Sequence, residues 1–252
     1  MIQRNELEGY MNRLLSIEQF KDYGPNGLQV EGRPQVQRLV SGVTASLALI
    51  EAALDLKADA ILVHHGLFWR GQDGRVTGWM KRRLQVLLAA DVNLYAYHLP
   101  LDGHPELGNN AQLGDVLGFK ADGRFGEYDL GFIGDAPPQP RQLAALELAA
   151  HVQARLGRAP VLVEGDGGPI KRIAWCTGGA QDWFEDAIAA GADAFITGEI
   201  SEPQAHYARE MGVAFLACGH HATERYGAQA VGRHVASHFG LDHEFIDIDN
   251  PA

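Results

Sequence analysis

The chain has few cysteines, no long apolar run and no charge excess of the kind that nucleic acids attract. Only two of its 252 residues are cysteines, Cys176 and Cys218, and each ends an apolar stretch. Two thiols so far apart make a zinc knuckle unlikely, and buried free thiols in a reducing, cytoplasmic setting explain them better than a disulfide does. No apolar run approaches the roughly 20 residues of a membrane-spanning helix, and the N-terminus lacks the charged-then-apolar pattern of a signal peptide.

Basic side chains are outnumbered by acidic ones, which gives a formal net charge of -11. Such a surface repels duplex nucleic acid unless basic groups are gathered locally, so nucleic acid is not an expected partner. The best basic cluster is the short run 81–83, which we interpret as the solvated face of a helix. The Gly-Lys-Ser/Thr type of phosphate-binding loop is also missing from the sequence.

What the sequence does have is an alternation of strand-like and helix-like segments, which predicts an α/β fold. The predicted strands are 38–44, 59–63, 92–97, segments near 161 and 173, 194–197, 213–218 and 244–248. The predicted helices are 2–15, 47–56, 78–90, one starting near 108, 142–156, 183–190, 204–211 and 223–238. The proline-rich segment 135–140 is the strongest linker candidate, because proline continues neither a helix nor a central strand.

The chain also resembles itself. Residues 51–60 (EAALDLKADA) match residues 185–194 (EDAIAAGADA) at a constant offset of 134, and 92–96 resemble 213–217. A common Ala-rich pattern could converge by chance, but the shared Glu and Ala-Asp-Ala favour duplication. We therefore expect two similar α/β/α layered domains, residues 1–125 and 126–252, with a metal site in the cleft between them.

Polar side chains follow two buried strands of the predicted first domain, where ligands gather in open α/β sheets. His64 and His65 come directly after an apolar strand, and Gly66 would permit the turn that brings both into one site. His98 and Asp102 follow the strand 92–97. His98 is either a metal ligand or an acid–base group beside one. A core histidine and an Asp-Gly turn are the structural alternatives for these residues.

In the second predicted domain, His220 and Glu224 are four residues apart and would share one face of a helix, whereas His221 would point elsewhere. The pooled donor set holds imidazoles and carboxylates without thiolates, which suits zinc, iron or manganese. It exceeds the four ligands of structural zinc and better matches two metal ions about 3.5–4 Å apart. Asp102 and Glu224 are the natural bridging candidates.

At these residues the sequence resembles the YbgI-like proteins of the Nif-three-like family, labelled GTP cyclohydrolase I type 2 homologues, over almost its whole length. The segments that carry the resemblance are 26–30 (NGLQV), 60–69 (AILVHHGLFW), 97–102 (YHLPLD), 108–110 (GNN), 196–199 (ITGE) and 218–225 (CGHHATER). The sequence departs from many relatives at Glu199, where they carry Asp, and at His221, where they carry Tyr. The departure at Glu199 leaves the role of that carboxylate open.

The resemblance implies a dinuclear centre of two divalent metal ions, zinc, iron or manganese. Its ligands would be His64, His65, Asp102, His220 and Glu224. It also implies a homohexameric ring with His98 near the metals. The expected function is a metal-dependent hydrolase that opens the guanine ring of a nucleotide or acts on a related small molecule, with His98 moving protons. The alternative is a non-catalytic, metal-dependent scaffold or regulatory protein.

Overall fold

The computed structural model describes residues 1–137 and 143–252, and these divide into two compact units. Unit 1 holds residues 1–108 and 227–249, and unit 2 holds residues 109–226 and 250–252. This division differs from the expected boundary at 125/126, because the chain enters unit 2 earlier and its C-terminal part returns to unit 1. The predicted linker starts at the end of a strand inside unit 2, and its residues 138–140 lie outside the described part.

Unit 1 is built on a five-stranded sheet of order β13-β4-β5-β6-β2, in which only β2 runs antiparallel to its neighbour. Its strands are β2 (Gly27–Val30), β4 (Arg38–Thr44), β5 (Ala60–His65), β6 (Asn93–Ala96) and β13 (Asp242–Phe245), with the short pair β1 (Ile2–Gln3) and β3 (Gln35–Val36) beside them. Its helical elements are α1 (Arg4–Leu14), η1 (Ile17–Gln19), α2 (Leu47–Asp55), α3 (Gly78–Ala90) and α4 (Leu99–Gly103).

Unit 2 is built on a six-stranded sheet of order β7-β8-β10-β11-β12-β9. Its strands are β7 (Gly123–Phe125), β8 (Gly131–Asp135), β9 (Val161–Val163), β10 (Arg172–Trp175), β11 (Ala194–Thr197) and β12 (Ala214–Ala217). Its helical elements are α5 (Asn109–Leu117), η2 (Glu127–Asp129), α6 (Ala145–Leu156), η3 (Gln181–Trp183), α7 (Phe184–Ala189) and α8 (Glu202–Met211). The unit boundary at 226/227 falls within helix α9 (His220–Phe239).

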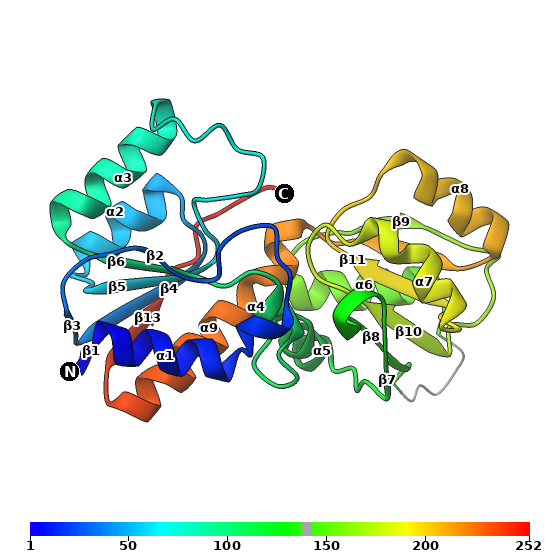
Figure 1. Ribbon diagram of the computed structural model, residues 1–252. Helices are drawn as coiled ribbons and strands as arrows, with labels where there is room; N and C mark the ends of the chain where they lie inside the picture. Colours follow the sequence, from blue (N-terminus) through cyan, green and yellow to red (C-terminus); the bar gives the residue numbers. More distant parts are fainter. Residues whose placement is uncertain (138–142) are drawn as a thin grey trace. The chain divides into compact units, whose positions relative to one another are not determined.

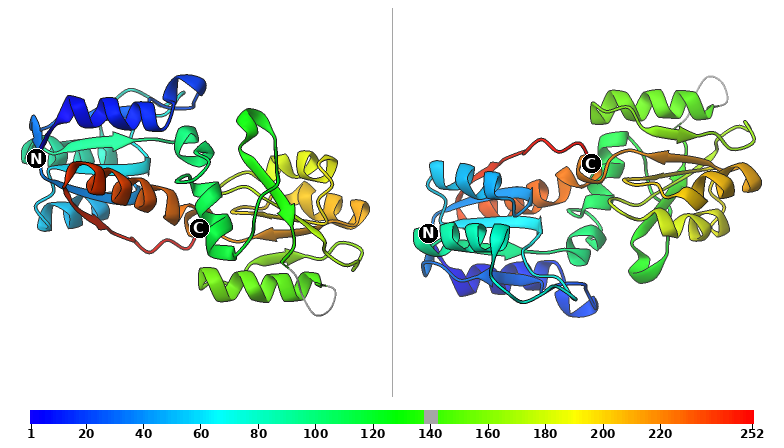
Figure 2. Two further views of the ribbon diagram at one scale, coloured as in Figure 1. Left: turned by 90° about the horizontal axis from the view of Figure 1, so that it is seen from below. Right: turned by 90° about the horizontal axis from the view of Figure 1, so that it is seen from above.

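Each unit buries apolar side chains on both faces of its sheet, because alternate residues of a strand point to opposite sides. In unit 1, Leu39 and Leu62 pack with α1 and the unit 1 part of α9, while Val40 and Ile61 pack with α2 and α3. Unit 2 repeats this with α5 and α6 on one face and α7 and α8 on the other. Figures 1 and 2 show these helices on opposite sides of the strands. Both units are therefore three-layered α/β/α structures, as predicted.

The duplication is confirmed by hydrogen bonds that recur at the same sequence offset. Asp59 precedes β5, and its Oδ2 accepts from the backbone N–H groups of Gln37 and Arg38, at 2.9 Å each. Asp193 precedes β11, and its Oδ2 accepts from those of Lys171 and Arg172, at 2.8 Å each. The shared Ala-Asp-Ala match in the sequence therefore marks a carboxylate that ties together the starts of two neighbouring strands in each unit.

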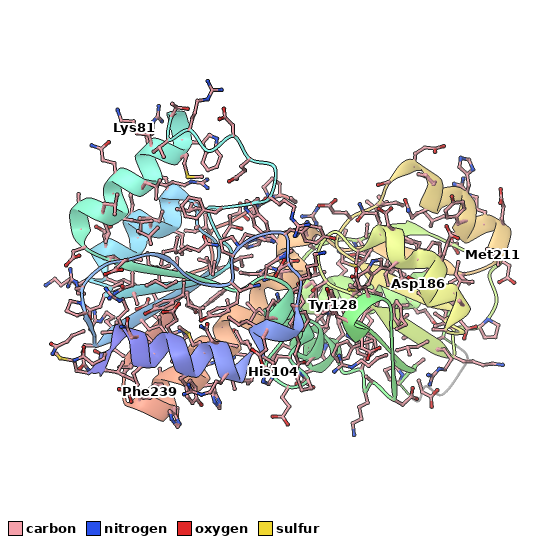
Figure 3. The ribbon with its side chains drawn as sticks, in the orientation of Figure 1. Lys81, His104, Tyr128, Asp186, Met211 and Phe239 are labelled. Carbon is pink, nitrogen blue, oxygen red and sulfur yellow. The ribbon has the colours of Figure 1, made fainter. Side chains whose placement is uncertain are left out.

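The run 81–83 lies on helix α3, where Lys81 and Arg82 are exposed and Arg83 lies over the ring of Trp79, 4.7 Å from its centroid. Lys81 projects from the outside of the helix in Figure 3. The interpretation of this cluster as a solvated helix face is confirmed. In the part of the chain that is described, no helix is long and apolar enough to cross a membrane.

The C-terminal strand β13 brings a pH-sensitive contact into unit 1. His243 Nε2 lies 2.8 Å from the hydroxyl oxygen of the fully buried Ser41. Burial, reinforced by the positive charge of Arg233, lowers the pKa of His243 to about 4. The unfolded chain therefore takes up a proton on this residue before the folded chain does. The stability that neutral His243 contributes is complete above its unfolded pKa of about 6.5 and is lost as the pH falls towards 4.

We expect the free energy of unfolding of the wild type to fall between pH 7 and pH 4 by about 1–2 kcal/mol more than that of His243→Gln, after allowance for partial solvent exposure. Urea unfolding of both proteins across this range measures the difference. Equal slopes for the two proteins would contradict the assignment.

Candidate metal centre

The first cluster of metal-competent side chains lies at the carboxyl ends of β5 and β6 in unit 1. His64 and His65 are the last residues of β5, and β6 leads through His98 into helix α4, which carries Asp102. His64, His65 and His98 each offer one ring nitrogen, and these three atoms all lie within 4.8 Å of one another. His64 Nε2 lies 3.5 Å from Asp102 Oδ1, and both residues are buried. The structure thus brings together the four site residues predicted for this part of the chain.

Hydrogen bonds at Nδ1 fix how these imidazoles are presented. His64 Nδ1 lies 3.0 Å from the carbonyl oxygen of Tyr97, which can only accept, so Nδ1 carries the proton and Nε2 the lone pair. His65 Nδ1 is bonded to the hydroxyl of Thr44 at 3.1 Å. This arrangement is typical of metal-binding histidines, whose second nitrogen is held by an outer acceptor.

His98 is held in the same way by a carboxylate that the sequence analysis missed. Asp22 Oδ1 lies 2.7 Å from His98 Nδ1, and the Asp22 side chain is only 2% exposed. Burial opposes ionisation of Asp22, but the hydrogen bond and charge of His98, with further bonds from Asn26 and Tyr23, hold its pKa below its usual value. Asp22 is therefore an anion that favours a proton on the imidazole nitrogen facing it.

A small pocket lies beside this cluster within unit 1. Its lining includes Asn26, His64, Trp69 and His98. The ring of Trp69 meets that of His98 at 90°, with 4.9 Å between centroids. The pocket therefore places an aromatic side chain next to two imidazoles.

The second cluster lies at the carboxyl ends of β11 and β12 in unit 2. Helix α9 begins at His220, three residues earlier than predicted, and places His220 Nε2 3.1 Å from Glu224 Oε2. The predicted shared helix face of these two residues is confirmed. On its other side, His220 Nδ1 lies 2.6 Å from Glu199 Oε1. The role of Glu199 that the sequence left open is thus to hold His220, as Asp22 holds His98.

Two carboxylates give this second cluster a strong preference for positive charge. Burial alone would lower the pKa of His220, but the hydrogen bonds and negative charges of Glu224 and Glu199 outweigh it and raise the pKa to about 9. The same negative charges would also attract a divalent cation, which would have to displace a proton from His220 in order to bind.

A glycine lies directly against the side chains of the second cluster. Gly178 follows strand β10 with a φ of +67°, and a Cβ built on it would collide with Glu224 Oε1 and lie 3.1 Å from His220 Nε2. Its backbone N–H donates to the buried hydroxyl of Thr223 at 3.0 Å. The sequence analysis did not single out Gly178, because nothing local distinguishes it from the chain's other glycines.

One sequence-based explanation is wrong in its mechanism. Gly66 was expected to relieve a turn after His65, but it is not among the described residues with positive φ. A Cβ on Gly66 would instead collide with the side chain of Gln29, which accepts a hydrogen bond from the Leu67 N–H at 2.7 Å. Close packing, rather than an unusual backbone conformation, accounts for glycine at this position.

The fold and these clusters define a class: a duplicated α/β protein that carries histidine–carboxylate clusters at its strand ends. The family described as Duf34/NIF3 (NGG1p interacting factor 3) matches residues 2–251, and the chain belongs to this family.

Individual relatives agree with this placement. The chain is 52% identical over 251 residues to a Pseudomonas aeruginosa protein named GTP cyclohydrolase 1 type 2 homolog, covering 96% of this chain and 95% of that one. A solved structure of protein ybgI superposes with a TM-score of 0.94 at 49% identity, and one from Thermus thermophilus with 0.89 at 33%; both comparisons cover 100% of each chain.

Proposed function

We propose that the protein binds two divalent metal ions through His64, His65, Asp102, His220 and Glu224, and that it is a metal-dependent hydrolase. The observation that carries the proposal is the common presentation of the imidazoles: in each of the three, Nδ1 is held by an oxygen atom of the protein. Such preorganisation aligns Nε2 for a cation before any cation arrives.

The substrate in this proposal is a nucleotide or a related small molecule, in keeping with the name GTP cyclohydrolase 1 type 2 homolog of the relatives. Bound divalent ions would supply Lewis acidity and would lower the pKa of water towards neutrality. The protein's own part is to move a proton at His98 Nε2, beside the ring of Trp69. The homohexameric ring and the cytoplasmic location expected from the sequence stay predictions.

The test combines metal analysis with a hydrolase screen. We expect the wild type to purify with two zinc, iron or manganese ions per chain and to turn over a nucleotide, phosphoester or cyclic amidine. His65→Ala and Glu224→Ala should each weaken metal binding by at least about 100-fold and abolish turnover. His221→Ala is the matched control, because the next residue of a helix points about 100° away and should keep both metals and turnover.

A second function has one observation in its favour, since the family description names an interacting factor. A metal-dependent scaffold would bind its metals tightly and show no turnover in the same screen. Metal-free wild type would contradict both functions. A loss of metal in His221→Ala equal to that in Glu224→Ala would contradict the ligand assignment on helix α9.

A further inference from the structure

The carboxylate of Asp22 is fully engaged within unit 1. Oδ1 accepts from His98 Nδ1 at 2.7 Å and from the Tyr23 N–H at 2.6 Å. Oδ2 accepts from Asn26 Nδ2 and from the Leu99 N–H, both at 2.9 Å. Four donors converge on one buried anion that lies in a coil between η1 and β2. A side chain so constrained holds its partner imidazole in one orientation.

The side chain of Asn26 is hydrogen-bonded to both Asp22 and His98. Its Nδ2 donates to Asp22, while its Oδ1 accepts from the backbone N–H of His98 at 2.8 Å. The segment 22–26 is also attached to the loop after β5, because the backbone N–H of Arg70 donates to the Tyr23 carbonyl at 2.6 Å and Arg70 Nη2 to that of Asp22 at 2.8 Å. The segment 22–26, which carries Asp22, is thus hydrogen-bonded both to the backbone of His98 and to the loop after β5.

We propose that Asp22 is a positioning residue: it keeps neutral His98 in the tautomer with the proton on Nδ1, so that Nε2 presents a lone pair to the pocket. An ionised carboxylate can only accept, so the nitrogen that faces it must carry a proton. The acid–base role of His98 rests on the proposed function, but the tautomer of His98 does not. This division allows the two to fail separately.

A purely structural role for Asp22 predicts something different. Asp22 would then only anchor the segment 22–26 to the end of β6, and its replacement would loosen that segment without reversing the tautomer. Asp22→Asn separates the two roles, because the amide keeps the size of the carboxylate but can turn an N–H donor towards His98. Nδ1 would then become the acceptor and the proton would move to Nε2, as happens when a carboxylate that orients a catalytic histidine is replaced by an amide.

The experiment is ¹⁵N NMR of the histidine rings in the metal-free protein, at a mildly alkaline pH where an unperturbed imidazole is neutral. The His98 signals are assigned by their loss in His98→Gln. In the wild type we expect His98 Nδ1 to be protonated and Nε2 unprotonated, and in Asp22→Asn we expect the reverse in the majority of molecules. Asp59→Asn is the matched control, since Asp59 also accepts backbone N–H groups in unit 1 but precedes β5, and it should leave His98 unchanged.

The wild-type spectrum alone can overturn the proposal, even if Asp22→Asn fails to fold, because a proton on His98 Nε2 contradicts it. An unchanged tautomer in folded Asp22→Asn contradicts it as well. Where the screen yields turnover, Asp22→Asn should lower kcat by at least about 100-fold while keeping both metal ions. Loss of metal in this variant would instead overturn the acid–base assignment of His98. Absence of turnover refutes the proposed hydrolase and leaves the tautomer result standing.

Discussion

Replacing Gly178 by alanine is expected to weaken binding of a divalent metal at His220 and Glu224 by about 100-fold, although the new side chain is a single methyl group. The methyl carbon would occupy the space of Glu224 Oε1 and lie 3.1 Å from His220 Nε2. Glu224 is buried, and helix α9 fixes its backbone. Its carboxylate must therefore rotate away from His220 to avoid the methyl group. A ligand pair aligned in the wild type would then have to be reordered by the metal.

A zinc titration against a competing chelator measures this effect. Gly191→Ala is the matched control, because Gly191 also lies in unit 2 with a positive φ of +88°, but a Cβ at this position would meet nothing within 4 Å. Both substitutions place alanine in a left-handed conformation and should lose about 1–2 kcal/mol of stability from that strain. Only Gly178→Ala should lose metal affinity. Equal affinities in the two variants would show that the carboxylate tolerates the methyl group.

The α/β alternation and the duplication could be predicted from the sequence because both are written in local patterns. An Ala-rich helix followed by an apolar strand repeats at a fixed offset, and the aspartates of the two copies make the same pair of hydrogen bonds. The candidate ligands could be predicted for a related reason. Imidazoles and carboxylates that directly follow buried strands are carried to the same edge of a sheet whatever the loops between them do.

The residues that support these ligands could not be predicted, because their partners are distant in the chain. Asp22 lies 76 positions before His98 in a coil without periodicity, and Glu199 meets His220 across 21 positions. The return of β13 to pair with β4 is likewise a long-range contact, with Asp242 opposite Arg38. It belongs to the segment 227–249 that returns to unit 1, and it explains why a single boundary near residue 125 does not describe the division.

The repeated aspartates lead to a prediction about stability. We expect Asp59→Ala and Asp193→Ala each to lower the free energy of unfolding by about 2–4 kcal/mol, because each removes a carboxylate that accepts two backbone N–H groups. The donors lie at the start of the neighbouring strand, which is β4 in unit 1 and β10 in unit 2. The substitution therefore removes the acceptor of their N–H groups at the point where that strand begins. Asp186→Ala, on the exposed face of α7 (Figure 3), is the control and should stay within about 0.5 kcal/mol of the wild type.

Urea unfolding gives the energies, and hydrogen exchange read by mass spectrometry locates them. Faster exchange in Asp59→Ala should appear at the amides of Gln37 and Arg38 in unit 1, and in Asp193→Ala at those of Lys171 and Arg172 in unit 2. Because the two copies make the same bonds with different neighbours, similar losses would mean that the stabilisation comes from the repeated hydrogen bonds themselves. A loss only in Asp59→Ala would assign it instead to the additional ion pair between Asp59 and Arg33, whose atoms lie 2.9 Å apart.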